Sequence, residues 1–373
     1  MVPRDTLNIK EDDLQSAGLV SIIMPVYNAE SFIHKSVNSV LVQEYKNVEL
    51  LLVNDGSTDR SEKLCNDYAI RDHRIRVISQ LNSGPAAARN TGLYHATGEY
   101  IFFLDADDYI LPSTVGTLVA AYNKHDPDLV ICNFAKQVTA GPPITQRVSF
   151  SPENSPFNEQ MKLLSASEVV AFVGHFLKYP SNHLISYCWA RLYKTAYFKE
   201  FGISSHEDMR LFEDYVLNLD YMSRISTVVF VNEPLYVYVM HESHASASMA
   251  ILNTESLLHD MSLFREKTRE FLQQNMKGST STPDIEKEIG HALIHYVIIF
   301  LVRSCRRLTN LNKQALSEEI GKLIRAPIVR ESLRQYTPTK GSSRLVPLLM
   351  RVGAVEILML LCRYKANKRY GRL

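Results

Sequence analysis

The sequence predicts an α/β fold: a doubly wound, mostly parallel sheet followed by a helical C-terminal extension. Three observations support this. Short apolar, β-branched runs alternate with segments of helical spacing from residue 19 to about residue 134, as βα units require. A cluster of polar residues follows the apolar runs, where a parallel sheet places its ligand site. From about residue 251 onward the pattern is mainly helical.

The elements of the first third follow from these patterns in order. Short apolar runs predict strands at 19–26, 48–53, 75–79, 100–104 and 128–134. Helical spacing predicts helices at 31–42, 61–70 and 85–96. Pro85 stands at a first helical position, where its missing N–H has no intrahelical partner to lose.

A segment without periodicity, residues 137–159, predicts a loop before a second unit. In that unit 165–179 and 214–222 have helical patterns, and two apolar runs on either side of Pro234 predict two strands, 227–231 and 235–240. We therefore divide the chain into four parts: an N-terminal tail (1–18), two halves of one α/β domain (19–135 and 136–248) and a helical C-terminal region (249–373).

Composition limits the classes of function. The chain has 373 residues and a net charge of +1, which predicts no nucleic-acid partner. Its five cysteines are scattered, without a CxxC pair, which argues against a zinc site and fits a reducing, cytoplasmic compartment. Residues 1–18 are polar and do not resemble a signal peptide. No uninterrupted apolar run reaches the roughly 18 residues of a membrane-spanning helix.

The most informative feature is an acidic turn directly after the predicted strand 100–104. Asp105, Asp107 and Asp108 lie within four residues. Carboxylates this close repel one another unless a cation or protons share the site. Mg²⁺ or Mn²⁺, which usually binds together with substrate phosphates, is the natural cation for such oxygen ligands. The alternative is a solvated acidic turn after a strand.

Further polar groups follow the neighbouring strands. Together they would form a crevice with an aromatic face, an acceptor, a cation and a metal site, which suits a nucleoside diphosphate. Taken singly, these residues are more often explained otherwise, Asp55 and Gly84 by a turn, Arg89 by the surface and Tyr27 by packing. Neither GxGxxG nor a P-loop is present. The residues are Tyr27, Asn28, Asp55, Asn82, Gly84 and Arg89.

Four runs, 20–28, 53–59, 82–92 and 103–108, resemble the motifs of family 2 glycosyltransferases of GT-A fold, in the same order. The resemblance implies inverting transfer of a sugar from a nucleotide sugar, usually UDP-linked. It implies that Asp105-Ala106-Asp107 is the DxD motif, with Asp105 near the ribose and Asp107 binding Mn²⁺ or Mg²⁺. The residues expected to bind the nucleotide sugar are Pro25, Tyr27, Asn28, Asp55, Asn82, Gly84, Arg89, Asp105, Ala106, Asp107 and His241.

Residues 136–248 show weaker similarity to the same family. The segment around Trp189 resembles that of bacterial surface-polysaccharide members, and Glu213-Asp214 resembles the family's "ED" motif, whose aspartate is the catalytic base. Alternatives are an acidic first helical turn without a catalytic role, or Asp208 as the base. His241 stands where relatives often have Arg, which leaves its role near the diphosphate open between a ligand and a surface histidine.

The resemblance implies products of the capsule, exopolysaccharide or wall-polymer type and a glycan, wall-polymer or lipid-linked acceptor. Two other classes stay open at this stage. A nucleotidyltransferase would need a Gly-rich, basic phosphate loop after the first strand, where this chain has Tyr27-Asn28-Ala29. A non-catalytic nucleotide- or polysaccharide-binding scaffold would have no need of the acidic pairs. The sequence also leaves open whether the protein forms homo-oligomers.

The C-terminal stretch 343–373 combines apolar helical character with seven Lys or Arg residues against one acid, Glu356. This pattern suits peripheral contact with the inner face of an anionic plasma membrane. Arg351 and Glu356 argue against a spanning helix. The alternative is a core or dimer helix with a solvated basic end. A second apolar segment, 291–302, is expected to pack against its neighbours.

Overall fold

The computed structural model describes residues 18–138, 161–178, 184–241, 253–275, 285–306, 308–309, 312–338 and 343–370. The predicted tail 1–18 and loop 137–159 lie almost wholly outside these ranges. The chain divides into two compact units. Unit 1 comprises Met1–Val169, Leu184–Glu207 and Glu213–Glu242, and unit 2 comprises Val170–His183, Asp208–Phe212 and Ser243–Leu373.

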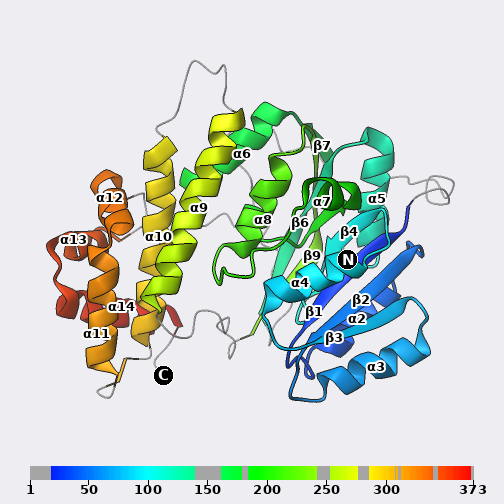
Figure 1. The fold of residues 1–373 in the computed structure, drawn as a ribbon, viewed down its shortest axis with the longest axis horizontal. Helices are drawn as coiled ribbons and strands as arrows, with labels where there is room; N and C mark the ends of the chain where they lie inside the picture. Colours follow the sequence, from blue (N-terminus) through cyan, green and yellow to red (C-terminus); the bar gives the residue numbers. More distant parts are fainter. Residues whose placement is uncertain are drawn as a thin grey trace. The chain divides into compact units, whose positions relative to one another are not determined.

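Unit 1 is built on one mixed sheet (Figure 1). Its order is β3-β2-β1-β4-β8-β6-β9-β5, with β7 paired to β9. The four strands β3, β2, β1 and β4 are mutually parallel. β8 runs antiparallel between β4 and β6, and β6 and β9 are parallel again. The strands are β1 (Val20–Val26), β2 (Val48–Asp55), β3 (Ile75–Gln80), β4 (Tyr100–Phe103), β5 (Tyr109–Ile110), β6 (Leu129–Val138), β7 (Met161–Leu164), β8 (Arg191–Lys194) and β9 (Val228–Met240).

Helices cover this sheet. α4 packs on β1 and β2, α3 packs on β2 and β3, and α5 packs on β6 and β9. All eight residues of β2 are buried, as a central strand covered on both faces requires. The α/β fold class and the five strands of the first part are therefore confirmed. The helices of unit 1 are α2 (Ile33–Leu41), α3 (Ser61–Arg71), α4 (Pro85–His95), α5 (Thr114–His125), α7 (Thr195–Phe201) and α8 (Glu213–Met222), with a 3₁₀ turn, η1 (Leu184–Ser186). α6 (Ala166–Lys178) begins in unit 1 and continues into unit 2.

The prediction of two strands around Pro234 was wrong. Residues 228–240 form one strand, β9, paired with β6 over its length. The register shifts around Asn133 of β6, which faces Pro234. A β-bulge at this point accommodates a residue that cannot donate a ladder hydrogen bond.

Unit 2 is helical. Its helices from residue 254 onward are α9 (Thr254–Asn275), α10 (Ile285–Arg306), α11 (Lys313–Arg325), α12 (Pro327–Gln335), α13 (Leu345–Val352) and α14 (Val355–Tyr370). α10 packs against α12 and α14. Within the described ranges it is the one helix long and apolar enough to cross a membrane, and 56% of its most apolar window is buried, as in a core helix.

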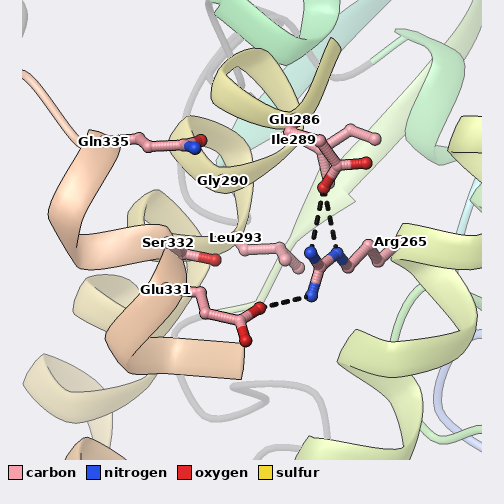
Figure 2. A pocket seen from close by; sticks show the side chains of 8 residues that line it. All are labelled: Arg265, Glu286, Ile289, Gly290, Leu293, Glu331, Ser332 and Gln335. Atoms are coloured by element: carbon pink, nitrogen blue, oxygen red, sulfur yellow. Dashed lines mark hydrogen bonds and ion pairs between the residues drawn. The ribbon is translucent and has the colours of Figure 1, made fainter. Parts of the chain in front are cut away.

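Ion pairs join three of these helices around a hollow of about 350 Å³ (Figure 2). Arg265 of α9 donates to Glu286 of α10 (3.0 Å) and to Glu331 of α12 (2.9 Å). Gly290 allows α10 to approach α12 closely, since a Cβ there would lie 3.3 Å from the Ser332 Cα. The charges that line this hollow are thus used to hold α9, α10 and α12 together.

Candidate active site

The carboxyl ends of the parallel strands lie side by side. β1 pairs with β2 as far as Val26 and Asn54, and with β4 as far as Ile23 and Phe103. The β2–β3 pairing ends at Asp55. The polar residues that directly follow these strands therefore share one edge of the sheet, where open α/β sheets bind ligands.

Asp55 is buried and holds the loop after β3. One of its oxygens accepts hydrogen bonds from the Gln80 amide (2.8 Å) and the Ser83 N–H (2.9 Å), and the other accepts from the Gly84 N–H (2.8 Å). Gly84 has φ +92°, a conformation that favours glycine. Asn82 of the same loop is exposed. Asp55 thus shapes the loop, and its contact with a nucleobase stays a prediction.

The turns after β1 and β2 are tied together. The Asn28 side-chain oxygen accepts from the Thr58 N–H (2.8 Å), and the Asn28 N–H donates to the Ser57 hydroxyl (3.2 Å). Pro25 lies partly buried within β1. The Tyr27 side chain is 52% exposed at this edge, so its ring is accessible to a planar ligand.

The acidic turn after β4 is held by its third carboxylate. Asp108 is buried and accepts from the Tyr236 hydroxyl (2.6 Å) and the Val239 N–H (2.7 Å) of β9. Burial, with Asp107 and Asp105 nearby, raises the pKa of Asp108 well above its ordinary value. The Ser36 hydroxyl lies 2.6 Å from the Ala106 carbonyl oxygen. Asp108 therefore fixes the turn. The Asp105 and Asp107 side chains are instead partly exposed.

Asp107 has a 44% exposed side chain, and its Oδ2 lies 4.0 Å from Nε2 of His241. The His241 ring also packs on Phe32, with centroids 4.2 Å apart. The structure thus brings His241 to the DxD turn. In the described ranges no three His, Cys, Asp or Glu side chains form a group that could hold a metal by themselves. A cation here would need further oxygen ligands, such as those of a diphosphate.

A single buried guanidinium joins the acidic turn to the predicted base. Arg89 of α4 donates to Asp214 Oδ1 (2.9 Å) and to Asp105 Oδ1 (3.2 Å). Burial raises the pKa of Asp105, and the Arg89 charge opposes that shift. We expected Arg89 among the nucleotide-sugar ligands. That role stays a prediction, and the two ion pairs of Arg89 also suit a residue that positions both carboxylates.

Asp214, the second residue of α8, is 9% exposed. Its Oδ2 accepts from the Cys188 N–H (3.2 Å). Three buried side chains hold the segment that carries this N–H. The Asn218 amide donates to Tyr187 O (2.9 Å), and the Tyr193 hydroxyl lies 2.9 Å from Cys188 O. The Arg191 guanidinium donates to Tyr187 O (2.9 Å) and also to Leu184 O.

The Trp189 ring packs against the segment beside Asp214. Its ring stacks on Tyr236 (centroids 4.4 Å apart, planes 6° apart) and on Tyr187 (4.3 Å, 14°). Because the Tyr236 hydroxyl donates to Asp108, this stack connects the segment beside Asp214 with the DxD turn.

The two other carboxylates considered for catalysis differ from Asp214. Asp208 belongs to unit 2, where it is 61% exposed and paired with His259 (2.8 Å). Glu213 opens α8 and is partly buried. Of the candidate bases, Asp214 is the one joined to the acidic turn through Arg89.

Comparison with known proteins places this site in a family. Residues 21–186 match the model of glycosyl transferase family 2. The glycosyltransferase GlyG of Streptococcus pneumoniae is 31% identical over 221 residues, which are 59% of this chain and 70% of GlyG. This chain belongs to glycosyltransferase family 2. Membership of this family argues against the nucleotidyltransferase alternative.

Two further similarities are informative. EpsJ of Bacillus subtilis, named an uncharacterized glycosyltransferase, is 37% identical over 220 residues, and the matched part covers 59% of this chain and 60% of EpsJ. The match thus spans less than two thirds of EpsJ. Staphylococcus aureus TarS 1–349 in complex with UDP-GlcNAc has the same fold, with a TM-score of 0.60 and 18% identity over 95% of this chain and 92% of that one. The GT-A-like fold is thus confirmed.

Backbone strain in this glycosyltransferase concentrates near the site. Four non-glycine residues of the described ranges have positive φ, namely Asn28, Asp126, Ala190 and Phe212. Asn28 follows β1, Ala190 lies two residues after Cys188, and Phe212 lies two residues before Asp214. Such strain is typical of functional sites, where the surrounding structure imposes it.

Sequence reasoning missed three roles at this site. It did not assign Asp108 to the interior, Arg89 to the two carboxylates, or Arg191 and Asn218 to the segment beside Asp214. The apolar strand before Asp108 was a usable signal for burial. The partners of Arg89 and Asn218 are distant in sequence, and no local pattern indicates them. Ser246 and Ser248, noted with His241, lie outside the described residues.

Proposed function

We propose that this glycosyltransferase moves a sugar, with inversion, from a UDP-sugar to a hydroxyl group of a glycan, wall-polymer or lipid-linked acceptor. The products would be bacterial capsule, exopolysaccharide or wall polymers. The observation that carries the proposal is the Arg89 bridge between Asp105 and Asp214. The UDP-GlcNAc complex of TarS, which has the same fold, supports a UDP-sugar donor.

In this proposal Asp214 is the general base. An inverting transfer needs one carboxylate that takes the proton of the acceptor hydroxyl as its oxygen attacks the anomeric carbon. Arg89 and the Cys188 N–H each occupy one oxygen of Asp214. Each carboxylate oxygen has two lone pairs, so either can still accept the acceptor proton. The same two contacts fix the direction of the carboxylate.

Asp107 and Asp105 are proposed to hold Mg²⁺ or Mn²⁺. The donor set fits a cation that also takes phosphate oxygens, because Asp107 is partly exposed and His241 is the neighbouring side chain. When bound, the cation would neutralise charge on the leaving diphosphate. Asp105 gives one oxygen to Arg89, which couples the position of the DxD turn to that of the base.

The test is to measure sugar transfer or donor hydrolysis from UDP-GlcNAc with Mn²⁺ present, using Asp214→Asn. We expect UDP affinity to be retained and turnover to fall by about 10²-fold or more. Asp208→Asn is the matched control and should keep its activity, because Asp208 pairs with His259 in unit 2. Near-normal turnover in Asp214→Asn, with loss in Asp208→Asn, would reject the assignment.

A further inference from the structure

The last two helices of unit 2 present apolar side chains on both their faces. α13 packs against α14, and both contact α10 (Figure 1). Their inward faces are buried, with Val346 and Met350 on α13 and Leu358 and Cys362 on α14. A helix of a soluble protein normally carries polar residues on its other face. Here the outward faces depart from that rule.

The outward faces carry two apolar triplets with the same spacing, i, i+3 and i+7, which places each triplet on one side of its helix. These side chains are 52% to 70% exposed. They are six of the fifteen exposed large apolar side chains in the described ranges, so the exposure is concentrated here. The triplets, which we call the apolar patch, are Leu345, Leu348 and Val352 on α13, and Ile357, Leu360 and Tyr364 on α14.

Positive charge accompanies the apolar patch. Arg344, Arg363 and Lys368 are exposed on the same two helices or directly before them. Lys368 follows Ile357 by eleven residues, which returns it to the apolar side of α14. The one acid of these helices, Glu356, is paired with Lys313 of α11 (2.9 Å). Arg351 faces the protein, since its guanidinium donates to the carbonyl oxygens of Leu333 and Tyr336.

The apolar patch could bind a second copy of the chain or a lipid membrane, and the positive charge beside it distinguishes between these partners. In a symmetric dimer each patch would meet its own copy, so these Arg and Lys residues would face like charges, which is unfavourable. A spanning helix does not fit α14, because Glu356, Arg363 and Lys365 would then lie at or within the hydrocarbon core. An anionic lipid surface satisfies both the apolar side chains and the cations.

We propose that α13 and α14 bind the surface of an anionic membrane, such as the cytoplasmic face of a plasma membrane. The apolar patch would enter the headgroup boundary, and Arg344, Arg363 and Lys368 would contact lipid phosphates. This inference does not depend on the identity of the donor or acceptor, so a failure of the catalytic proposal would leave it standing.

The experiment is co-sedimentation of the full chain with phosphatidylcholine vesicles, with and without an equal part of phosphatidylglycerol. We expect binding to the mixed vesicles only, and its loss at high salt. Leu348→Ser with Leu360→Ser, and separately Arg363→Glu with Lys368→Glu, should each weaken binding about tenfold or more. The matched control, Ile70→Ser with Arg71→Glu, alters an exposed apolar and basic pair on α3 (Ile70 is 84% exposed) and should bind normally.

Thermal melting and light scattering of the same variants complete the test. All the substituted side chains are exposed, so the variants should melt as the unchanged chain does. Absence of binding to the mixed vesicles, or equal binding with and without phosphatidylglycerol, would overturn the proposal. A dimer of the unchanged chain that dissociates in the α14 variants would overturn it too, by identifying the apolar patch as an interface between copies.

Discussion

Replacement of Arg89 is the sharpest test of the site. Its guanidinium nitrogens lie 2.9 Å from Asp214 Oδ1 and 3.2 Å from Asp105 Oδ1, which puts the two carboxylates on the order of 5 Å apart. At an effective dielectric constant of about 20, two negative charges at that separation repel by about 3 kcal/mol. Arg89→Gln removes the cation that offsets this repulsion. Without the Arg89 charge, which opposes the effect of burial, the pKa of Asp105 should rise further.

The expected result follows from that repulsion. It drives the Asp214 carboxylate out of the position in which it can accept the proton of an acceptor hydroxyl, so kcat should fall by about 10²-fold. The acidic limb of the pH profile of kcat should move to higher pH, because the charge that opposes the raised pKa of Asp105 is gone. The assay is UDP release from a UDP-sugar between pH 5 and pH 9, with a buffer series of constant ionic strength.

Stability needs its own control, because breaking a buried ion pair costs about 3–5 kcal/mol. Arg89→Lys keeps the positive charge but loses the planar guanidinium that bonds two carboxylates at once. It should therefore fold well and show a smaller shift in the pH profile. UDP affinity and the melting temperature report whether each variant is folded. An Arg89→Gln protein that is folded and shows an unchanged pH profile with normal kcat would refute the positioning role of Arg89.

Three other predictions follow from single contacts. Asp107→Ala should weaken UDP binding in the presence of Mn²⁺, as measured by calorimetry, and unchanged affinity would move the cation elsewhere. Burial raises the pKa of Asp260 to about 6, so the folded state binds a proton that the unfolded state releases, and stability falls as pH rises from about 4 to about 6. Asp260→Asn should therefore gain about 1 kcal/mol over the unchanged chain above pH 6 in thermal melts, with no gain at pH 4. Asn218→Leu removes the side-chain donor to the Ile185 carbonyl oxygen and one of two partners of the Tyr187 carbonyl oxygen and of the Tyr193 hydroxyl. It should cost about 1–3 kcal/mol in denaturant unfolding, whereas a cost near zero would show that the segment beside Asp214 does not depend on it.

The parts of the fold that could be predicted are those whose signal is local. β2 is apolar throughout because both its faces are covered, and its run was visible in the sequence. Pro234 misled the prediction, because a proline that usually ends a strand here occupies a bulge in β9. β8 was not predicted, since its four residues include a buried arginine, Arg191.

The candidate site likewise contains residues that local sequence predicts and residues that it does not. Asp105 and Asp107 were predictable because a buried strand ends directly before them, and parallel strands bring their ends together. The Arg89–Asp214 pair was not, because 125 residues separate its members. Nothing in α4 distinguishes Arg89 from a surface cation until the sheet places α4 on β1 and β2. Tertiary structure, not spacing, assigns its partners.

The shared guanidinium also explains why residues from distant parts of the chain must fold together before the site exists. Arg89 comes from a helix beside β1, Asp105 follows β4, and Asp214 opens a helix more than a hundred residues later. The Arg89 guanidinium is buried and would be costly without its carboxylate partners, because an unpaired buried charge is costly. Asp214 is also buried and has Arg89 and the Cys188 N–H as partners. The network therefore links the turn after β4 to the first turn of α8 through one guanidinium, so the positions of Asp105 and Asp214 depend on each other.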